Sequence, residues 1–245
     1  MENYFSIVIN ACNQKDWISK CIESCLSQDY DNFEVLMVDA LSDDQTFEIA
    51  KKYENNSKFK LFQNEKRVPQ IANISFLTKN SKEKSIIVTV DGDDHLINSK
   101  VLNKLNTIYS DSDVWMTYGN FVNSRGQLPG WVYAYPESVI TNNWFREYDW
   151  LATHLRTYRR ELFLKIDEED FKRDGEWMVT TGDQAFMIPM LEMSGSRSKF
   201  IPEPLYVYND SLVSNDTNTN RHNQIEMANY IRRNKKKYKI ISSIW

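Results

Sequence analysis

The stretch SIIVTVDGDD, residues 85–94, decides which fold this sequence predicts. Its first six residues are apolar almost throughout, a pattern typical of a strand that is buried on both faces of a parallel sheet. The acidic residues Asp91, Asp93 and Asp94 follow that strand at once. Because ligands of open α/β sheets bind beyond the carboxyl ends of the strands, this junction is also the first candidate site.

Segments with strand and helix patterns alternate around that stretch. The alternation predicts an α/β fold with a central, mainly parallel sheet flanked by helices. We expect further strands at Phe5–Ile9, Glu34–Val38, Phe59–Phe62, Val114–Tyr118 and Leu205–Tyr208. We expect helices at Trp17–Leu26, Thr46–Tyr53, Gln70–Leu77, Glu161–Ile166, Ala185–Met193 and Gln224–Lys237. Residues 119–150 are interpreted as a long loop region of a kind that is often functional, and the polar stretch 211–220 as a mobile one.

The composition is that of an ordinary globular protein, with 41% hydrophobic and 26% charged residues and a formal net charge of -4. This charge argues against nucleic acid as a partner. The basic run 232–237 is either a solvated helix end or a patch for an acidic partner or a membrane surface. Three cysteines without a C-x-x-C pair indicate a reducing compartment. With no leader pattern and no apolar run of about 18 residues, we expect a soluble, cytoplasmic protein without a transmembrane segment.

The Asp91-Gly92-Asp93-Asp94 turn is suited to a divalent cation. Carboxylates are ligands that Mg²⁺ and Mn²⁺ prefer, and such an ion bridges the phosphates of a diphosphate. Gly92 lets the backbone turn tightly and approach a ligand. The alternative is an acidic turn or a helix N-cap before Ser99, because a lone Asp-x-Asp pattern is common.

A second acidic position, Asp39, follows the strand predicted at Glu34–Val38. A carboxylate at that place can accept hydrogen bonds from a nucleobase or a ribose. Asp43 and Asp44 come shortly before the next predicted helix, and we interpret them as its capping residues.

A family resemblance rests on three segments, IVINACN (7–13), VDALSDDQT (38–46) and VTVDGDD (88–94). Their order and spacing resemble family 2 glycosyltransferases with the GT-A fold, over roughly residues 4–210. In that family the corresponding motifs are usually Pro-Thr-Tyr-Asn, Val-Asp-Asp-Gly-Ser and Asp-x-Asp-Asp. This chain departs from the pattern at Asn10, Cys12 and Ala40, which affects the nucleobase preference and leaves the metal site untouched.

The resemblance implies one GT-A domain over residues 1–245. Its nucleotide-binding half would cover about 1–118, its acceptor-binding half about 119–220 and a C-terminal helix about 221–245. The implied activity is inverting, metal-dependent transfer from a nucleoside-diphosphate sugar, expected to be a UDP-sugar, to a hydroxyl of a glycan, lipid or protein acceptor. The implied cofactor is Mn²⁺ or Mg²⁺. The implied nucleotide-sugar contacts are Asn10, Ala11, Asn13, Asp39, Arg67, Asp91, Gly92 and Asp93.

The same resemblance assigns roles at the metal. Asp93 is the implied main ligand, with Asp91 near the ribose and the metal. The stretch 153–159 resembles a His-x-Arg stretch of some metal-dependent members, including chondroitin-polymerase-like domains, in which the histidine completes the metal shell. His154 would take that role, and its nitrogen suits Mn²⁺ better than Mg²⁺, unless it is a satisfied structural histidine. Arg156 either neutralises diphosphate charge or forms an ordinary ion pair, and Arg67 is otherwise a surface arginine.

Asp183 stands at the place of the catalytic base in inverting members, just before the helix predicted at Ala185–Met193. Such a base takes the proton of the acceptor hydroxyl while the hydroxyl oxygen attacks the anomeric carbon. The alternative is that Asp183 only caps that helix. Aromatic side chains either line an acceptor groove or pack in the core, and the candidates are Trp131, Tyr133, Tyr135, Trp144, Tyr206 and Tyr208.

Two other functions stay open from the sequence. A nucleotidyltransferase uses a related sheet and a metal, but its first loop normally carries glycines with Arg or Lys, and the loop 10–15 has no glycine. A non-catalytic sugar-binding or scaffold protein should have lost an acidic site residue, yet Asp91, Asp93 and Asp183 are all present.

Overall fold

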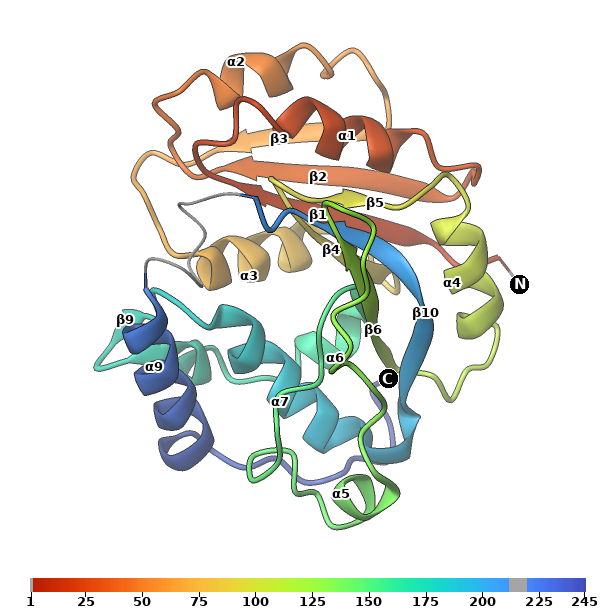
Figure 1. Cartoon of the computed structure of the whole chain (residues 1–245), viewed down its shortest axis with the longest axis vertical. Coiled ribbons are helices and arrows are strands. Elements are labelled where there is room, and N and C mark those ends of the chain that lie inside the picture. Colours follow the sequence, from red (N-terminus) through yellow and green to blue (C-terminus); the bar gives the residue numbers. More distant parts are fainter. Residues whose placement is uncertain (1, 212–219) are drawn as a thin grey trace.

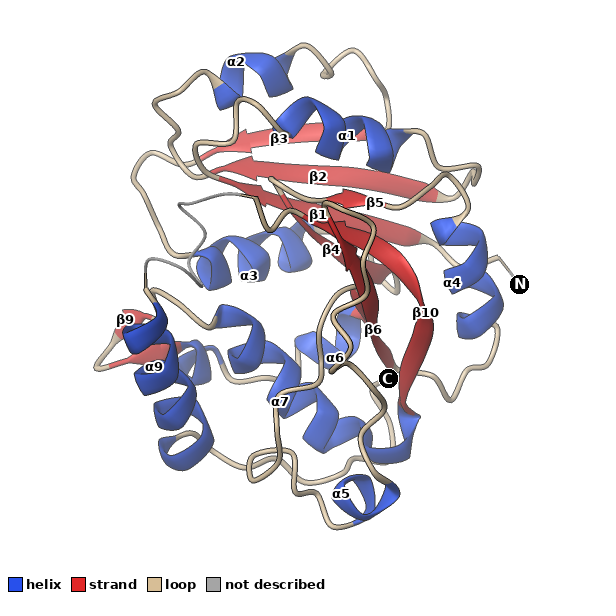
Figure 2. Ribbon diagram, in the orientation of Figure 1, coloured by secondary structure: helices blue, strands red, loops and turns tan. Residues whose placement is uncertain are grey.

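A computed structural model describes residues 2–211 and 220–245, so most of the polar stretch predicted at 211–220 lies outside the described residues. Figure 1 shows a central sheet with helices on both of its faces, and Figure 2 separates the two kinds of element by colour. The predicted architecture, a mainly parallel sheet flanked by helices, is confirmed.

The first half of the chain builds the parallel part of the sheet, in the order β3-β2-β1-β4. Strands β1, β2 and β4 are buried almost throughout, as the apolar runs predict, whereas the edge strand β3 is largely exposed or half-buried. The strands are β1 (Phe5–Ala11), β2 (Phe33–Asp39), β3 (Phe59–Gln63) and β4 (Ile86–Asp91). The helices between them are α1 (Ile18–Leu26), α2 (Thr46–Lys51) and α3 (Gln70–Asn80).

The second half extends the same sheet beyond β4, in the order β7-β6-β10-β5. β7 runs antiparallel to both β4 and β6, and β5 runs antiparallel to β10, whereas β6 and β10 are parallel. The sheet is therefore mixed at this end. The strands are β5 (His95–Leu96), β6 (Met116–Asn123), β7 (Arg156–Arg159) and β10 (Ser198–Tyr208).

The remaining elements lie around this second half. The α-helices are α4 (Val101–Tyr109), α5 (Glu137–Thr141), α6 (Arg160–Phe163), α7 (Gly182–Ser194) and α9 (Arg221–Asn234). Two short strands, β8 (Lys172–Arg173) and β9 (Glu176–Trp177), form a separate ribbon, and the 3-10 turns are η1 (Glu168–Phe171) and η2 (Gly195–Arg197). The sequence prediction omits α4, β5 and β7, and it places α5 inside a loop region.

Two hydrophobic cores lie on the two faces of the sheet. Because successive side chains of a strand point to opposite faces, Val8 of β1 belongs to the core with α3 and α7, and Ile9 to the core with α1 and α4. This double coverage explains why β1, β2 and β4 have no solvent-exposed face. The carboxyl ends of the parallel strands are thereby fixed on a rigid base.

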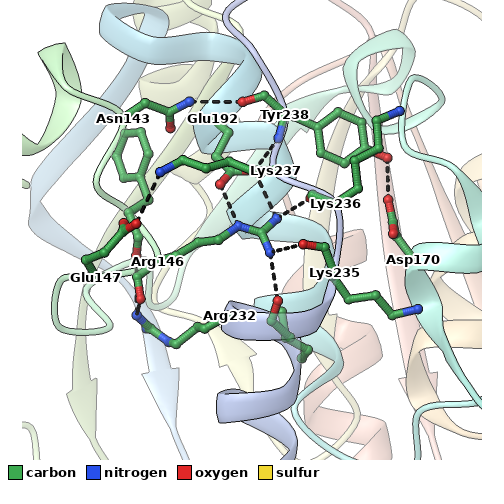
Figure 3. A network of polar contacts seen from close by, with 12 residues as sticks. Asn143, Arg146, Glu147, Asp170, Glu192, Arg232, Lys235, Lys236, Lys237 and Tyr238 are labelled. Carbon is green, nitrogen blue, oxygen red and sulfur yellow. Dashed lines mark hydrogen bonds and ion pairs between the residues drawn. The ribbon is translucent and has the colours of Figure 1, made fainter.

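A buried ion pair fastens the C-terminal segment to the rest of the molecule (Figure 3). Arg146 Nε donates to Glu192 Oε1 at 2.6 Å, and both side chains are almost fully buried. Arg146 also donates to three backbone carbonyls, those of Ile231, Lys235 and Lys236. The start of the basic run is therefore packed against the rest of the protein. Arg232 in this run also donates to backbone carbonyls, those of residues 145, 146 and 148.

We expect Arg146→Met to lower the free energy of unfolding by about 3–5 kcal/mol, because it leaves the buried carboxylate of Glu192 unpaired. The double variant Arg146→Met/Glu192→Leu should recover part of that loss, since no buried charge is left, although the three backbone carbonyls still lack the donor that Arg146 provided. Urea denaturation measures both. Lys237→Met, which breaks an exposed ion pair with Glu147, is the matched control and should change little. Equal losses in the single and double variants would contradict the expectation.

Candidate functional site

A cavity of about 970 Å³ opens beyond the carboxyl ends of β1 and β4, where the sequence predicts a site. One side of its lining comes from the segments after β1 and β4 and from the start of α3. The other side comes from the start of α7 and from α9. The predicted site residues that line it are Asn10, Arg67, Asp91, Gly92, Asp93, Trp131, His154, Arg156, Asp183 and Tyr208.

Three predicted residues, Ala11, Asn13 and Asp39, are not part of the lining. Asp39 is fully buried, and its carboxylate accepts from the backbone N–H of Ser42 at 3.0 Å and from Gln63 Nε2 at 3.3 Å. Asn13 has a left-handed φ of 57°, and its side-chain oxygen accepts from the backbone of Asp43 at 3.0 Å. Asp39 and Asn13 thus hold the loops after β1 and β2 together, and Ala11 is buried beneath them.

Asn10 is oriented by a chain of side-chain amides. Asn73 Nδ2 donates to Asn10 Oδ1 at 2.7 Å, and Asn64 Nδ2 donates to Asn73 Oδ1 at 2.8 Å. Asn73 is buried inside α3, so the orientation of Asn10 is set by a helix that packs against β1. The sequence prediction did not include Asn64 or Asn73, because an asparagine in a sequence does not by itself indicate a functional site.

Arg67 lies at the rim of the cavity, about half exposed. Its Nη2 pairs with Asp43 Oδ2 at 3.0 Å, and its Nε donates to the carbonyl of Leu41 at 3.3 Å. The Asp43 side chain therefore pairs with Arg67 and does not cap α2. Asp44 Oδ1 accepts from the backbone N–H of Thr46, the first residue of α2, but the N-cap position is held by Gln45, so neither aspartate is the cap residue.

Two carboxylates and an imidazole meet at the centre of the cavity. One ligand atom from each of Asp91, Asp94 and His154 lies within 4.8 Å of the other two. Asp94 is almost fully buried, and its Oδ2 has no hydrogen-bond partner among the described residues, while Oδ1 accepts from the backbone of Asn209 at 2.7 Å. Asp93 lines the cavity without joining this group. The donor set of two oxygens and one nitrogen is chemically suited to a divalent cation.

The electrostatics of the group indicate repulsion that a cation would relieve. Burial raises the pKa of Asp91, and burial followed by the charge of Asp91 raises the pKa of Asp93 to about 6. The pKa of Asp94 lies well above its ordinary value, again through burial first and then the charge of Asp93. Burial, with Arg156 beside it, holds the pKa of His154 well below its ordinary value. The imidazole is therefore neutral, which is the form that binds a metal.

Aromatic rings hold His154 in place. Its ring stacks on Tyr206 with the centroids 4.5 Å apart and on Tyr208 with the centroids 5.6 Å apart. The ring of Phe121 stands edge-on to it, with the centroids 5.8 Å apart. Tyr206 is fully buried, and its hydroxyl accepts from the backbone N–H of Asp91 at 3.0 Å. Strand β10 thereby fixes both the histidine and the end of β4.

An ion pair joins β7 to the start of α7. Arg156 Nη2 donates to Asp183 Oδ2 at 2.8 Å, and Asp183 Oδ1 accepts from the backbone of Gln184 at 2.9 Å. The helix begins at Gly182 after Thr181, whose φ is 60° and whose side chain makes no cap bond. Asp183 therefore lies inside the first turn and is not the cap residue. Arg156 also donates Nε to the carbonyl of Ala152 at 3.2 Å.

The aromatic candidates separate into cavity and core. Trp131 and Tyr208 line the cavity, and Trp131 is 49% exposed. Tyr135 belongs to the core and accepts from the backbone of Leu151. Tyr133 and Trp144 are exposed on the surface away from the lining. Of these aromatic candidates, Trp131 and Tyr208 are therefore the ones placed to contact a molecule in the cavity.

Sequence reasoning missed the wall that α9 provides. Gln224, Ile225 and Ala228 line the cavity together with Val179. Val179 is 68% exposed and Ile225 is 55% exposed, so both offer aliphatic surface to a ligand. In a sequence these residues look like ordinary apolar positions, and only the fold shows that they face a cavity.

Known proteins resemble this chain in sequence. The model of Glycosyl transferase family 2 matches residues 6–167. The poly(ribitol-phosphate) beta-N-acetylglucosaminyltransferase TarS of Staphylococcus aureus is 30% identical over 126 residues, 50% of this chain and 22% of the relative. The UDP-Glc:alpha-D-GlcNAc-diphosphoundecaprenol beta-1,3-glucosyltransferase WfaP of Escherichia coli is 28% identical over 134 residues, 55% of this chain and 52% of the relative. The chain thus spans about a fifth to a half of these relatives.

Solved structures show the fold. Staphylococcus aureus TarS in complex with UDP-GlcNAc has a TM-score of 0.66 at 20% identity, covering 85% of this chain and 59% of that one. A mannosyltransferase of Pyrobaculum calidifontis in complex with GDP-Man and Mn²⁺ has a TM-score of 0.58 at 16% identity, covering 84% and 57%. The GT-A fold expected from the sequence is confirmed. Among the described residues, no helix combines the length and apolar character of a membrane span.

Gly92 offers a test of how tightly the site is built. A Cβ on Gly92 would lie 2.7 Å from the Cβ of Ala11, closer than packing allows. We expect Gly92→Ala to lower the free energy of unfolding by about 1–3 kcal/mol through overpacking, measured by urea denaturation. Ala11→Gly removes the clashing atom, so Ala11→Gly/Gly92→Ala should lose less than the sum of the two single variants. Additive losses would rule out this contact as the cause.

Proposed function

This chain belongs to glycosyl transferase family 2, and we propose that it is an inverting, metal-dependent glycosyltransferase. Its donor would be a nucleoside-diphosphate sugar, specifically a UDP-sugar, and its acceptor a hydroxyl of a glycan, lipid-linked or protein molecule. The observation that carries the proposal is one cavity in which the Asp91–Asp94–His154 group faces the Arg156–Asp183 ion pair. These are the groups needed to hold a diphosphate and to deprotonate an acceptor.

A UDP-linked donor is supported by the relatives. The E. coli relative is named for UDP-Glc, and the S. aureus structure contains UDP-GlcNAc. We assign the nucleotide to the end of the cavity formed by Asn10 and Arg67, where an oriented amide and a cation are present. Asp39 and Asn13 would act indirectly, by fixing the loops that form the nucleotide end of the cavity.

A metal at the Asp91–Asp94–His154 group is supported by the unpartnered Oδ2 of Asp94 and by the neutral imidazole. A divalent cation bound there supplies Lewis-acid stabilisation of the charge on the leaving diphosphate. Asp93, beside the group, is a further candidate ligand, as the sequence implies. The imidazole nitrogen favours Mn²⁺ over Mg²⁺.

Asp183 is proposed as the base. It lies on the α7 side of the cavity, with a side chain that is 26% exposed and therefore accessible to an acceptor. The acceptor oxygen forms a bond to the anomeric carbon, its proton passes to Asp183, and the bond to the diphosphate breaks with its electron pair. Trp131, Val179 and Ile225 would contact the acceptor, because they offer exposed apolar surface in the lining of the same cavity.

Neither rival function gains support. A nucleotidyltransferase needs a glycine-rich first loop for a triphosphate, whereas the segment after β1 carries side chains and is fixed by Ser42 and Asp43. A scaffold protein has no need of a buried, mutually repelling set of carboxylates, which costs stability.

The metal assignment is tested by thermal shift with Mn²⁺. We expect Mn²⁺ to raise the melting temperature of the wild type. Asp94→Asn should abolish the shift and should not lower the melting temperature without metal, because repulsion is relieved. Asp113→Asn, at an exposed aspartate in the turn before β6 that does not line the cavity, is the control. If Asp93→Asn abolished the shift and Asp94→Asn did not, Asp93 would be the essential ligand.

The catalytic assignment is tested by a screen of UDP-, GDP- and dTDP-sugars with Mn²⁺, in which released nucleoside diphosphate is followed. One donor, a UDP-sugar, should be cleaved in a metal-dependent reaction. Asp183→Asn should lower the rate about 10²–10⁴-fold, because the base is lost, and should not weaken UDP binding, because Arg156 stays available to the diphosphate. Asp113→Asn should react like the wild type. Absence of UDP binding in the presence of Mn²⁺ would refute the proposed function.

A further inference from the structure

Both oxygens of the candidate base are engaged in the structure. Asp183 Oδ2 accepts from Arg156 at 2.8 Å, and Oδ1 accepts from the backbone of Gln184 at 2.9 Å. A base that is to take a proton must turn a free carboxylate oxygen toward the acceptor hydroxyl. The Gln184 contact belongs to the backbone at the start of α7. Arg156 is therefore the partner that can be exchanged.

The guanidinium of Arg156 lies where a diphosphate would compete for it. Its Nη1 lies 3.4 Å from Nδ1 of His154, and its charge and that of Asp183 both act on Asp91. Arg156 thus stands between the candidate metal group and the candidate base. A phosphate oxygen accepts from a guanidinium with the same fork geometry as a carboxylate.

The exchange needs no movement of the sheet. The main chain of Arg156 is held in β7, where its carbonyl accepts from Thr89 Oγ1 at 3.2 Å, and its Nε is bound to the carbonyl of Ala152. Only Nη2 has to change partner. The Arg156 side chain is 10% exposed and Asp183 is 26% exposed, so the released carboxylate is the group that faces the open cavity.

We propose that Arg156 couples donor binding to release of the base. In the free protein it masks Asp183, and the diphosphate of the donor takes over Nη2, which frees Asp183 Oδ2 for the acceptor hydroxyl. Arg156 is in this respect a positioning residue that makes the base available after the donor has bound. The inference rests on the proposed function, because it requires a nucleoside diphosphate in this cavity.

Carboxylate labelling tests the exchange without a known acceptor. A water-soluble carbodiimide with glycine ethyl ester is applied to the protein alone, with Mn²⁺ and UMP, and with Mn²⁺ and UDP, and the sites are read by peptide mass spectrometry. UMP covers the nucleoside end but lacks the second phosphate. We expect labelling of Asp183 to be about threefold higher with UDP than with UMP, the factor that loss of a partly exposed ion pair gives.

Variants separate masking from a purely structural role. Arg156→Gln should label strongly at Asp183 in the free protein, with no further rise on adding UDP. Arg156→Lys keeps the cation and should label weakly, like the wild type. Equal labelling of Asp183 in the wild type and the Gln variant would overturn the inference. If the Gln variant fails to fold, the comparison of UMP with UDP on the wild type still tests whether the diphosphate releases Asp183.

The same spectra report donor binding separately. Protection of Asp91 and Asp94 by Mn²⁺ and UDP shows that the ligand occupies the cavity. Protection there, with Asp183 labelled equally under UMP and UDP, overturns the exchange and leaves the proposed function standing. Absence of protection at both Asp91 and Asp94 defeats the exchange and the proposed function together.

Discussion

The structure depends on holding like charges together in a place where water screens them poorly. Asp91 ends one buried strand, and Asp93 and Asp94 follow it. Burial raises the pKa of all three, and the charges of neighbouring aspartates raise the pKa of Asp93 and Asp94 further. Left alone, such a turn would open. It stays closed because separate elements hold it. Gln70 at the start of α3 donates its amide to Asp91 at 2.6 Å, and Asn209, the residue after β10, donates its backbone N–H to Asp94. The fold is organised so that several elements converge on this one turn.

That convergence also explains the neighbouring cationic and aromatic groups. Arg156 is the cation whose charge opposes the repulsion at Asp91, and it comes from the strand directly beside β4. Tyr206 braces the backbone of Asp91 on one side and the ring of His154 on the other. A site that is costly when empty is a common property of functional centres, because the ligand repays the cost.

Much of the first half could be predicted from sequence, because buried parallel strands read as continuous apolar runs. The second half could not. The β7 segment carries two arginines and yet is buried throughout, since Arg156 pairs with Asp183 and Arg159 donates to the carbonyl of Val114. In β10, Pro202 and Pro204 argue against a strand, but register shifts in its pairing with β6 accommodate them. The choice between Asp93 and Asp94 depends on how the turn at residue 92 directs each side chain, which no residue pattern reveals.

The position of β7 has a consequence for how the chain is made. β7 lies between β4 and β6, although both of these precede it in the sequence. Until residues 156–159 leave the ribosome, β4 and β6 each have an open edge, and unpaired edges are prone to wrong pairing. A nascent chain that ends after β6 therefore holds the acidic turn without its cationic neighbour. The two halves of the protein differ in their residue patterns, but they become one continuous sheet once this short strand is inserted.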